Sequence, residues 1–146
     1  SHKSEKDNVL TIFAKIPEEL NEKAERLLKF VGLHQKRKLR AGDLSFGQQK
    51  LLELAMALMN EPKVLLLDEP SLGIAPKLVN QIFSSIKNIN KDKKVTVFLV
   101  EQNAKKALEL ADRGYVLVNG KISLEGAGKD LLNNPDVQAA YLEGGK

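Results

Sequence analysis

An apolar stretch that ends in two adjacent carboxylates limits most strongly what this chain can fold into. Residues 64–67 read Val-Leu-Leu-Leu, and Asp68, Glu69 and Pro70 follow directly. The stretch is too short for a helix and is apolar at successive positions, which is typical of a central parallel strand covered on both faces. Open α/β sheets bind ligands at the carboxyl ends of such strands, so both carboxylates are expected to line a crevice.

The two carboxylates predict a site for metal-assisted hydrolysis. Charged groups at the end of a buried strand are costly unless a partner compensates them, and a magnesium ion and a proton are natural partners. Asp68 is therefore predicted to hold Mg²⁺ through water, and Glu69 to accept the proton of an attacking water molecule. A strand followed by a simple helix cap is the alternative explanation.

A second segment, Leu44-Ser-Phe-Gly-Gln48, reads as the start of a helix that can bind an anion. Ser45 and Gln48 have the spacing of a capping box. Free backbone N–H groups attract anions to a helix N-terminus, and Gly47 allows a close approach of the backbone. Considered alone, the segment is explained more simply as a capped helix without a ligand.

Hydrophobic periodicity predicts an α/β fold with a mainly parallel sheet, preceded by a helical section. We expect a polar lead over residues 1–7, in which Ser1-His2 is typical of a cleaved tag, a helical section over 8–60 and the sheet-bearing part over 61–146. Helices are expected over 17–31, 45–59 and 104–111, with a further helix that starts at 76 and a last one that ends at 142. Strands are expected over 64–67 and 95–100, followed by a hairpin over 115–124 that turns at Asn119-Gly120.

Composition excludes several classes of protein. The 146 residues hold no cysteine and only two histidines, so neither a disulfide framework nor a zinc site is expected. No apolar run is long enough to cross a membrane. The net charge is +4 and the densest basic segment is 36–40. No aromatic residues interleave with that segment, so a solvated loop is favoured and no nucleic-acid partner is expected.

Together, the two motifs resemble those of ATP-binding-cassette (ABC) ATPases. Residues 44–48 are similar to the signature Leu-Ser-Gly-Gly-Gln, with Phe46 in place of the first Gly, and 64–70 resemble the Walker B strand with its catalytic Glu. The resemblance covers about 8–145 and implies a partial P-loop NTPase core with ATP and Mg²⁺ as cofactors. It also implies that the ATP of a partner subunit is bound by the signature residues, which are Ser45, Phe46, Gly47 and Gln48.

Further segments resemble the ATPase subunits of branched-chain amino-acid importers. These segments are residues 68–76, 99–104, 111–117 and 134–142. The resemblance implies an ATP-hydrolysing subunit bound peripherally to the cytoplasmic face of the cell membrane. Its partners would be a second ATPase subunit and membrane permease subunits, with a binding protein acting indirectly by supplying the substrate.

Two positions differ from the general ABC pattern. The switch position, usually His, is Gln102, and the D-loop position, usually Asp, is Ala75. Both substitutions are similar to those of the importer subgroup. Glutamine can hydrogen-bond a phosphate or a water molecule but cannot become cationic, so Gln102 is expected to contact the γ-phosphate region as part of the catalytic site.

The sequence contains no Walker A loop, G-x-x-x-x-G-K-[ST], because no Gly-Lys pair is followed by Ser or Thr. We therefore expect this chain to hold ATP poorly alone, to expose part of an apolar sheet, and to self-associate or bind a complementing chain. Two alternatives to the importer interpretation stay open. One is a non-catalytic cassette that acts as an interaction module, and the other is an ABC ATPase with a different cargo.

Overall fold

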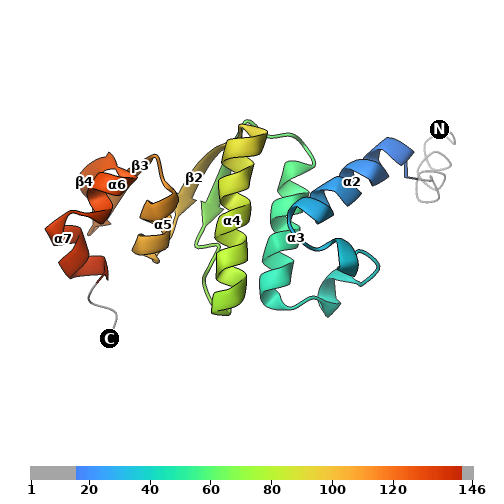
Figure 1. Ribbon diagram of the computed structural model, residues 1–146, viewed down its shortest axis with the longest axis horizontal. Coiled ribbons are helices and arrows are strands. Elements are labelled where there is room, and N and C mark those ends of the chain that lie inside the picture. The colour runs from blue at the N-terminus through green and yellow to red at the C-terminus, as the bar shows by residue number, and fades with distance from the viewer. Residues whose placement is uncertain (1–15, 143–146) are drawn as a thin grey trace, which may run out of the picture.

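The elements follow one another in space roughly in chain order, from α2 at one end of the molecule to α7 at the other (Figure 1). The computed structural model describes residues 16–142. The predicted lead, the beginning of the predicted helical section and the last residues of the sheet-bearing part lie outside the described residues. None of the described helices is long and apolar enough to cross a membrane.

In the described part of the helical section, from residue 16 on, two helices and two short 3₁₀ turns follow one another. These are α2 (Glu18–Phe30), η1 (His34–Lys36), η2 (Ala41–Asp43) and α3 (Phe46–Leu58). The predicted helices are confirmed, except that Pro17 is the cap of α2 rather than its first residue. The predicted stop is confirmed because Gly32 has a φ of 75°, a left-handed conformation that glycine adopts without strain.

Polar contacts hold η1 against α2. His34 Nε2 lies 3.0 Å from Glu25 Oε2, and Arg37 Nε lies 3.3 Å from Glu25 Oε1. The hydrogen bond with His34, followed by the nearby charge of Arg37, holds the pKa of Glu25 below its ordinary value. The rest of the basic segment is exposed, as expected for a solvated loop.

A parallel strand pair forms the centre of the fold. The strands β1 (Val64–Asp68) and β2 (Thr96–Val100) are joined by α4 (Pro76–Lys93). Their register runs from Val64 opposite Thr96 to Asp68 opposite Val100. Pro76 starts α4 at a position where its missing N–H is not needed. The predicted strand–helix–strand unit is therefore confirmed.

The C-terminal elements form a separate small unit. They are α5 (Ala104–Leu110), the antiparallel strands β3 (Arg113–Val118) and β4 (Lys121–Ala127), α6 (Gly128–Leu132), α7 (Pro135–Val137) and a π-helical turn (Gln138–Leu142). Asn119 and Gly120 have positive φ, which confirms the predicted hairpin turn. The predicted α/β class is confirmed, with the parallel pair β1–β2 and the predicted hairpin as two separate two-stranded sheets in the described part. A tight turn joins β3 to β4, and such a turn pairs strands antiparallel.

The main core lies between α2, α3, α4 and one face of the parallel pair. Its buried members come from every one of these elements and from the loops beside them: Leu27, Val31, Leu33, Leu51, Leu54, Ala55, Leu58, Leu65, Ile82, Ile86, Ile89 and Val95. A second cluster, made of Leu108, Leu131 and Val137, holds the C-terminal unit together. In the main core, the members from α3 and α4 recur at helical spacing, as on the apolar face of a helix with a 3.6-residue period.

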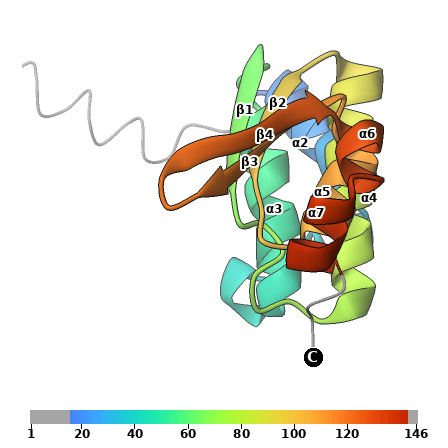
Figure 2. The same ribbon diagram turned by 90° about the vertical axis from the view of Figure 1, so that its left-hand side faces the viewer.

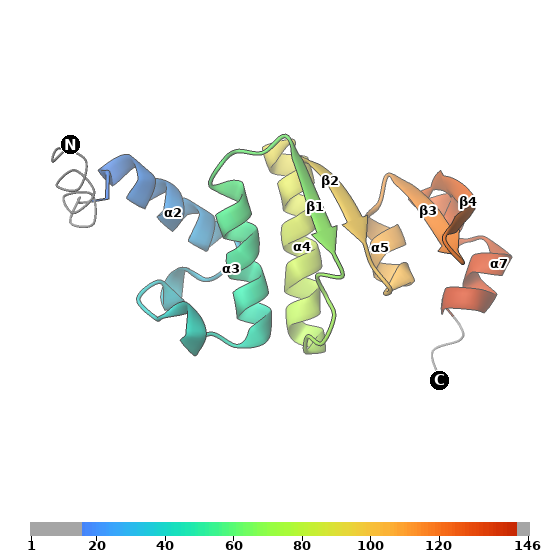
Figure 3. The same cartoon turned by 180° about the vertical axis from the view of Figure 1, so that it is seen from behind.

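The opposite face of the parallel pair is open in the described part of the chain. Leu66 is 72% exposed and Phe98 57%, and their neighbours Val64 and Val100 are also exposed. Figure 3 shows β1 and β2 in front of α4, with this face toward the viewer. The prediction that β1 is covered on both faces is wrong here, because α3 and α4 pack on one face only. The expected exposure of apolar sheet is confirmed, while self-association stays a prediction.

Replacing Gly128 by alanine is expected to separate α5 from α6. A Cβ atom there would lie 2.2 Å from the carbonyl oxygen of Ala111 and 2.6 Å from that of Leu108, and backbone cannot yield as a side chain can. We expect Gly128→Ala to lower the free energy of unfolding by about 1–3 kcal/mol, as overpacking generally does. Urea denaturation measures this, with Gly42→Ala as the control, because nothing lies within 4 Å of a Cβ at Gly42. Equal stability of the two variants would contradict the close packing.

Candidate functional site

The carboxyl ends of β1 and β2 bring two loops together. The strand register ends at Asp68 opposite Val100, and the backbone N–H of Glu69 donates to the carbonyl oxygen of Val100 over 2.8 Å. The loop 69–73 and the loop 101–103 therefore start at the same edge of the sheet. Figure 2, a view from the end of the molecule, shows how the hairpin crosses in front of these strands.

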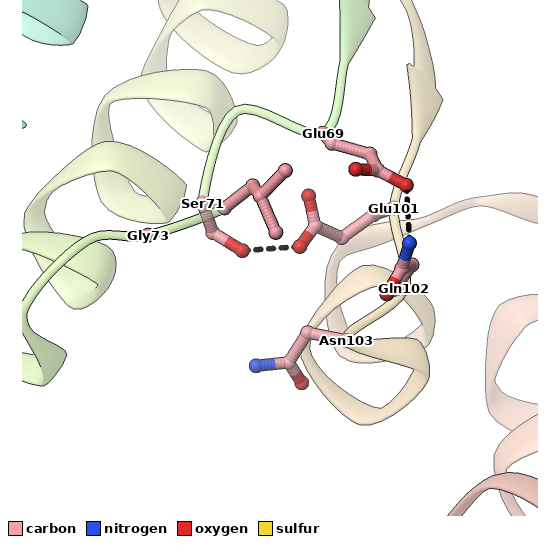
Figure 4. A pocket seen from close by; sticks show the side chains of 7 residues that line it. Glu69, Ser71, Gly73, Glu101, Gln102 and Asn103 are labelled. Atoms are coloured by element: carbon pink, nitrogen blue, oxygen red, sulfur yellow. Dashed lines mark hydrogen bonds between the residues drawn. The ribbon is translucent and has the colours of Figure 1, made fainter.

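A shallow pocket of about 200 Å³ lies between the two loops. It is lined by Glu69, Ser71, Leu72, Gly73, Glu101, Gln102 and Asn103 (Figure 4). Two predicted site residues meet there, since Gln102 Nε2 donates a hydrogen bond of 2.6 Å to Glu69 Oε1. The structure thus joins a carboxylate that can accept a proton to an amide that can hydrogen-bond a phosphate or water.

Glu69 has an unusual backbone conformation. Its φ of 43° lies in the left-handed region, which non-glycine residues seldom adopt. Such strain persists where the surrounding structure holds it, and it is frequent at functional sites. The turn at Glu69 directs the chain away from the strand and into the loop that lines the pocket.

Ser71 and Glu101 also line the pocket, and sequence reasoning did not assign them a role. Ser71 Oγ donates a hydrogen bond to Glu101 Oε1 (Figure 4). Glu101 Oε2 is buried and has no hydrogen-bond partner among the described residues. Their position is the feature of the sequence that points to a role in the site, because Glu101 directly precedes Gln102 and Ser71 directly follows the carboxylate-Pro sequence.

Asp68 lies at the end of β1 but outside the group of residues that lines the pocket. Its side chain is exposed, and within residues 16–142 no hydrogen bond or ion pair involves its carboxylate. A carboxylate that is free of protein partners can coordinate Mg²⁺ directly or through water, so the donor chemistry of Asp68 fits the predicted metal.

The predicted signature residues lie at the start of α3. Ser45 and Gln48 form the predicted capping box, in which the Ser45 N–H donates to Gln48 Oε1 over 3.1 Å. Gly47 is buried, and a Cβ there would lie 2.7 Å from Leu78 Cδ1. In this structure Gly47 therefore allows α3 to pack against α4. Phe46 is 55% exposed, which leaves its ring accessible beside the cap.

The signature residues and the pocket form two separate groups. None of residues 45–48 lines the pocket. One contact between them runs through the loop after β1, because a Cβ at Gly73 would lie 3.8 Å from Phe46 Cε1. Glu69 and Gln102 are thus brought together, whereas the signature residues lie at the start of α3, where Ser45 and Phe46 are exposed and Gly47 is buried.

Known proteins with similar sequences are named as branched-chain amino acid transport ATP-binding proteins. Residues 1–72 match the family model described as ABC transporter. The high-affinity branched-chain amino acid transport ATP-binding protein BraG of Pseudomonas aeruginosa is 53% identical over 115 residues, which are 79% of this chain and 49% of BraG. The chain therefore spans about half the length of the curated relatives it matches.

Solved structures of ATP-binding cassettes share the fold. The ADP conformation of MJ1267, an ATP-binding cassette of an ABC transporter, aligns with a TM-score of 0.73 and 36% identity over 95% of this chain and 56% of that one. A dimeric post-hydrolysis cassette, MJ0796 bound to ADP and Pi, aligns with a TM-score of 0.66 and 28% identity over 78% of this chain and 49% of that one.

Proposed function

Because the chain belongs to the family of ABC transporter ATP-binding proteins, we propose that it forms part of the ATP-hydrolysing subunit of a branched-chain amino-acid importer. The observation that carries this proposal is the hydrogen bond between Gln102 and Glu69 at the carboxyl ends of the parallel strands. The similarity to BraG supports the cargo, since that relative serves branched-chain amino-acid transport.

In the proposed reaction, Glu69 is the general base that takes a proton from the attacking water. Its carboxylate is held by the amide of Gln102, whose oxygen and second N–H make no other hydrogen bond within residues 16–142 and can serve a phosphate or a water molecule. Asp68 would hold Mg²⁺, which would neutralise charge on the phosphates of bound ATP. Ala75, in place of an aspartate, caps α4 without contributing a charge.

The signature segment is proposed to serve a second subunit. Ser45, Phe46, Gly47 and Gln48 lie apart from the pocket of their own chain, which supports a contact with the ATP of a partner rather than with the same nucleotide. Dimeric MJ0796 offers a precedent for paired cassettes. We further propose permease subunits as membrane partners, a binding protein as an indirect one, and a peripheral location at the cytoplasmic face of the membrane.

A chimera tests this function directly. The part of BraG that matches this chain over 115 residues is replaced by the chain's own residues, and leucine uptake is measured in cells that lack BraG. We expect the chimera to restore uptake, because the transplanted part carries Glu69, Gln102 and the signature. Wild-type BraG and an empty vector are the controls.

Two other results would redirect the proposal. A chimera that assembles and hydrolyses ATP without leucine uptake would indicate an ABC ATPase with a different cargo. A chimera that assembles but hydrolyses nothing would indicate a non-catalytic interaction module and would contradict the proposed roles of Glu69 and Gln102.

A further inference from the structure

A second hydrogen bond joins the two loops of the pocket, and we propose that it positions Gln102 against Glu69. Ser71 Oγ donates to Glu101 Oε1 across the pocket, beside the bond from Gln102 to Glu69 (Figure 4). Ser71 and Glu101 are thus positioning residues. The inference rests on the proposed function for its importance to hydrolysis, but the geometry that it predicts can be measured without nucleotide.

The two loops need a link beyond the strands. Backbone pairing between them ends where the Glu69 N–H meets the Val100 carbonyl oxygen. Past that point, the hydrogen bonds between the loops of the described chain come from side chains, from Gln102 to Glu69 and from Ser71 to Glu101. The Gln102–Glu69 pair is exposed, and water competes for exposed polar groups, so it needs support from the second bond.

The partly buried surroundings of Glu101 explain why its bond with Ser71 holds the carboxylate in place. Both residues are half-buried, and Glu101 Oε2 has no partner in the described part of the chain. A partly buried carboxylate is costly unless it accepts hydrogen bonds, and within the described residues the hydroxyl of Ser71 is the side-chain donor to its other oxygen, Oε1. Without that hydroxyl, Glu101 is expected to turn toward solvent, and the adjoining Gln102 would move with it.

The strained backbone of Glu69 supports the same role for Ser71. A φ of 43° at a glutamate persists only where neighbouring contacts hold it. Ser71 lies in the short loop that follows Glu69, and its side chain ties that loop to the end of β2. The bond between Ser71 and Glu101 therefore acts on both partners of the pair, on Glu69 through the first loop and on Gln102 through the second.

The test is nuclear magnetic resonance of the side-chain amide of Gln102 in this chain, without nucleotide. We expect Ser71→Ala to shift the Gln102 side-chain resonances and Ser71→Thr, which keeps the hydroxyl, to leave them near their original positions. Ser84→Ala is the matched control, because Ser84 is exposed on α4 and does not line the pocket. The backbone spectrum shows whether each variant keeps its fold.

Removing the other partner gives an independent variant should Ser71→Ala fail to fold. Glu101→Ala is expected to shift the Gln102 resonances as Ser71→Ala does, and the double variant to shift them no further, because both changes remove the same bond. Unchanged Gln102 resonances in a folded Ser71→Ala or Glu101→Ala variant would overturn the proposal. Failure of the chimera to support uptake would leave this result intact, so the two proposals can fail separately.

Discussion

Glu69→Gln is expected to slow ATP hydrolysis in the chimera by about 10²–10⁴-fold while nucleotide binding persists. Glutamine has nearly the same shape and can still hydrogen-bond Gln102, but its amide cannot accept the proton of the attacking water. A positioned general base contributes about 10²–10⁴-fold to a rate, so hydrolysis should fall by that factor. Phosphate release measures the rate, and fluorescent-nucleotide titration measures the binding.

The matched control is Glu109→Gln, which makes the same chemical change at an exposed position on α5, outside the pocket. We expect this variant to hydrolyse ATP at the rate of the unchanged chimera. If Glu69→Gln also hydrolysed ATP at that rate, Glu69 would not be the base, and the two carboxylates at the end of β1 would need another explanation.

Ile82→Ala is expected to have the largest effect on stability. Ile82 is 0% exposed in the middle of α4, where it packs against α3 and the covered face of the parallel strands. Truncation of such a side chain removes apolar contact and leaves a cavity, which costs about 2–5 kcal/mol. Typical domains have about 5–15 kcal/mol of net stability, so this variant should be close to unfolding.

The control for this prediction is Ile122→Ala, the same truncation on the hairpin strand β4, where the side chain is 59% exposed. Its free energy of unfolding should change by about 0.5 kcal/mol or less, as is usual for surface substitutions. Urea denaturation of both variants measures the difference. Similar losses at the two positions would mean that the core does not lie where α4 meets the strands.

Most of the local structure could be predicted from the sequence because its signals are short-range. Asn119-Gly120 specifies a hairpin turn, Gly32 ends a helix, and Ser45 and Gln48 cap the next one. The apolar residues 64–67 alone predict the strand that the structure extends to Asp68. These features depend on a few neighbouring residues, so no knowledge of the tertiary fold was needed.

The longer-range features could not be predicted in the same way. Continuous apolar sequence in β1 indicated cover on both faces, yet Leu66 is open because cover depends on residues that pack from elsewhere. The contact between Ser71 and Glu101 joins two loops that only the strand register brings together. The burial of Gly47 against Leu78 likewise depends on how α3 meets α4, not on the motif itself.

The most direct test of the central claim is the titration of this chain with ATP in a calorimeter, alone and mixed with a separately made segment that carries a Walker A loop. Heat of binding is expected only in the mixture, because the sequence holds the Walker B strand, switch glutamine and signature but no phosphate-cradling loop. Tight binding of ATP by the chain alone would require a phosphate site outside the residues assigned here, and the assignment would then be wrong.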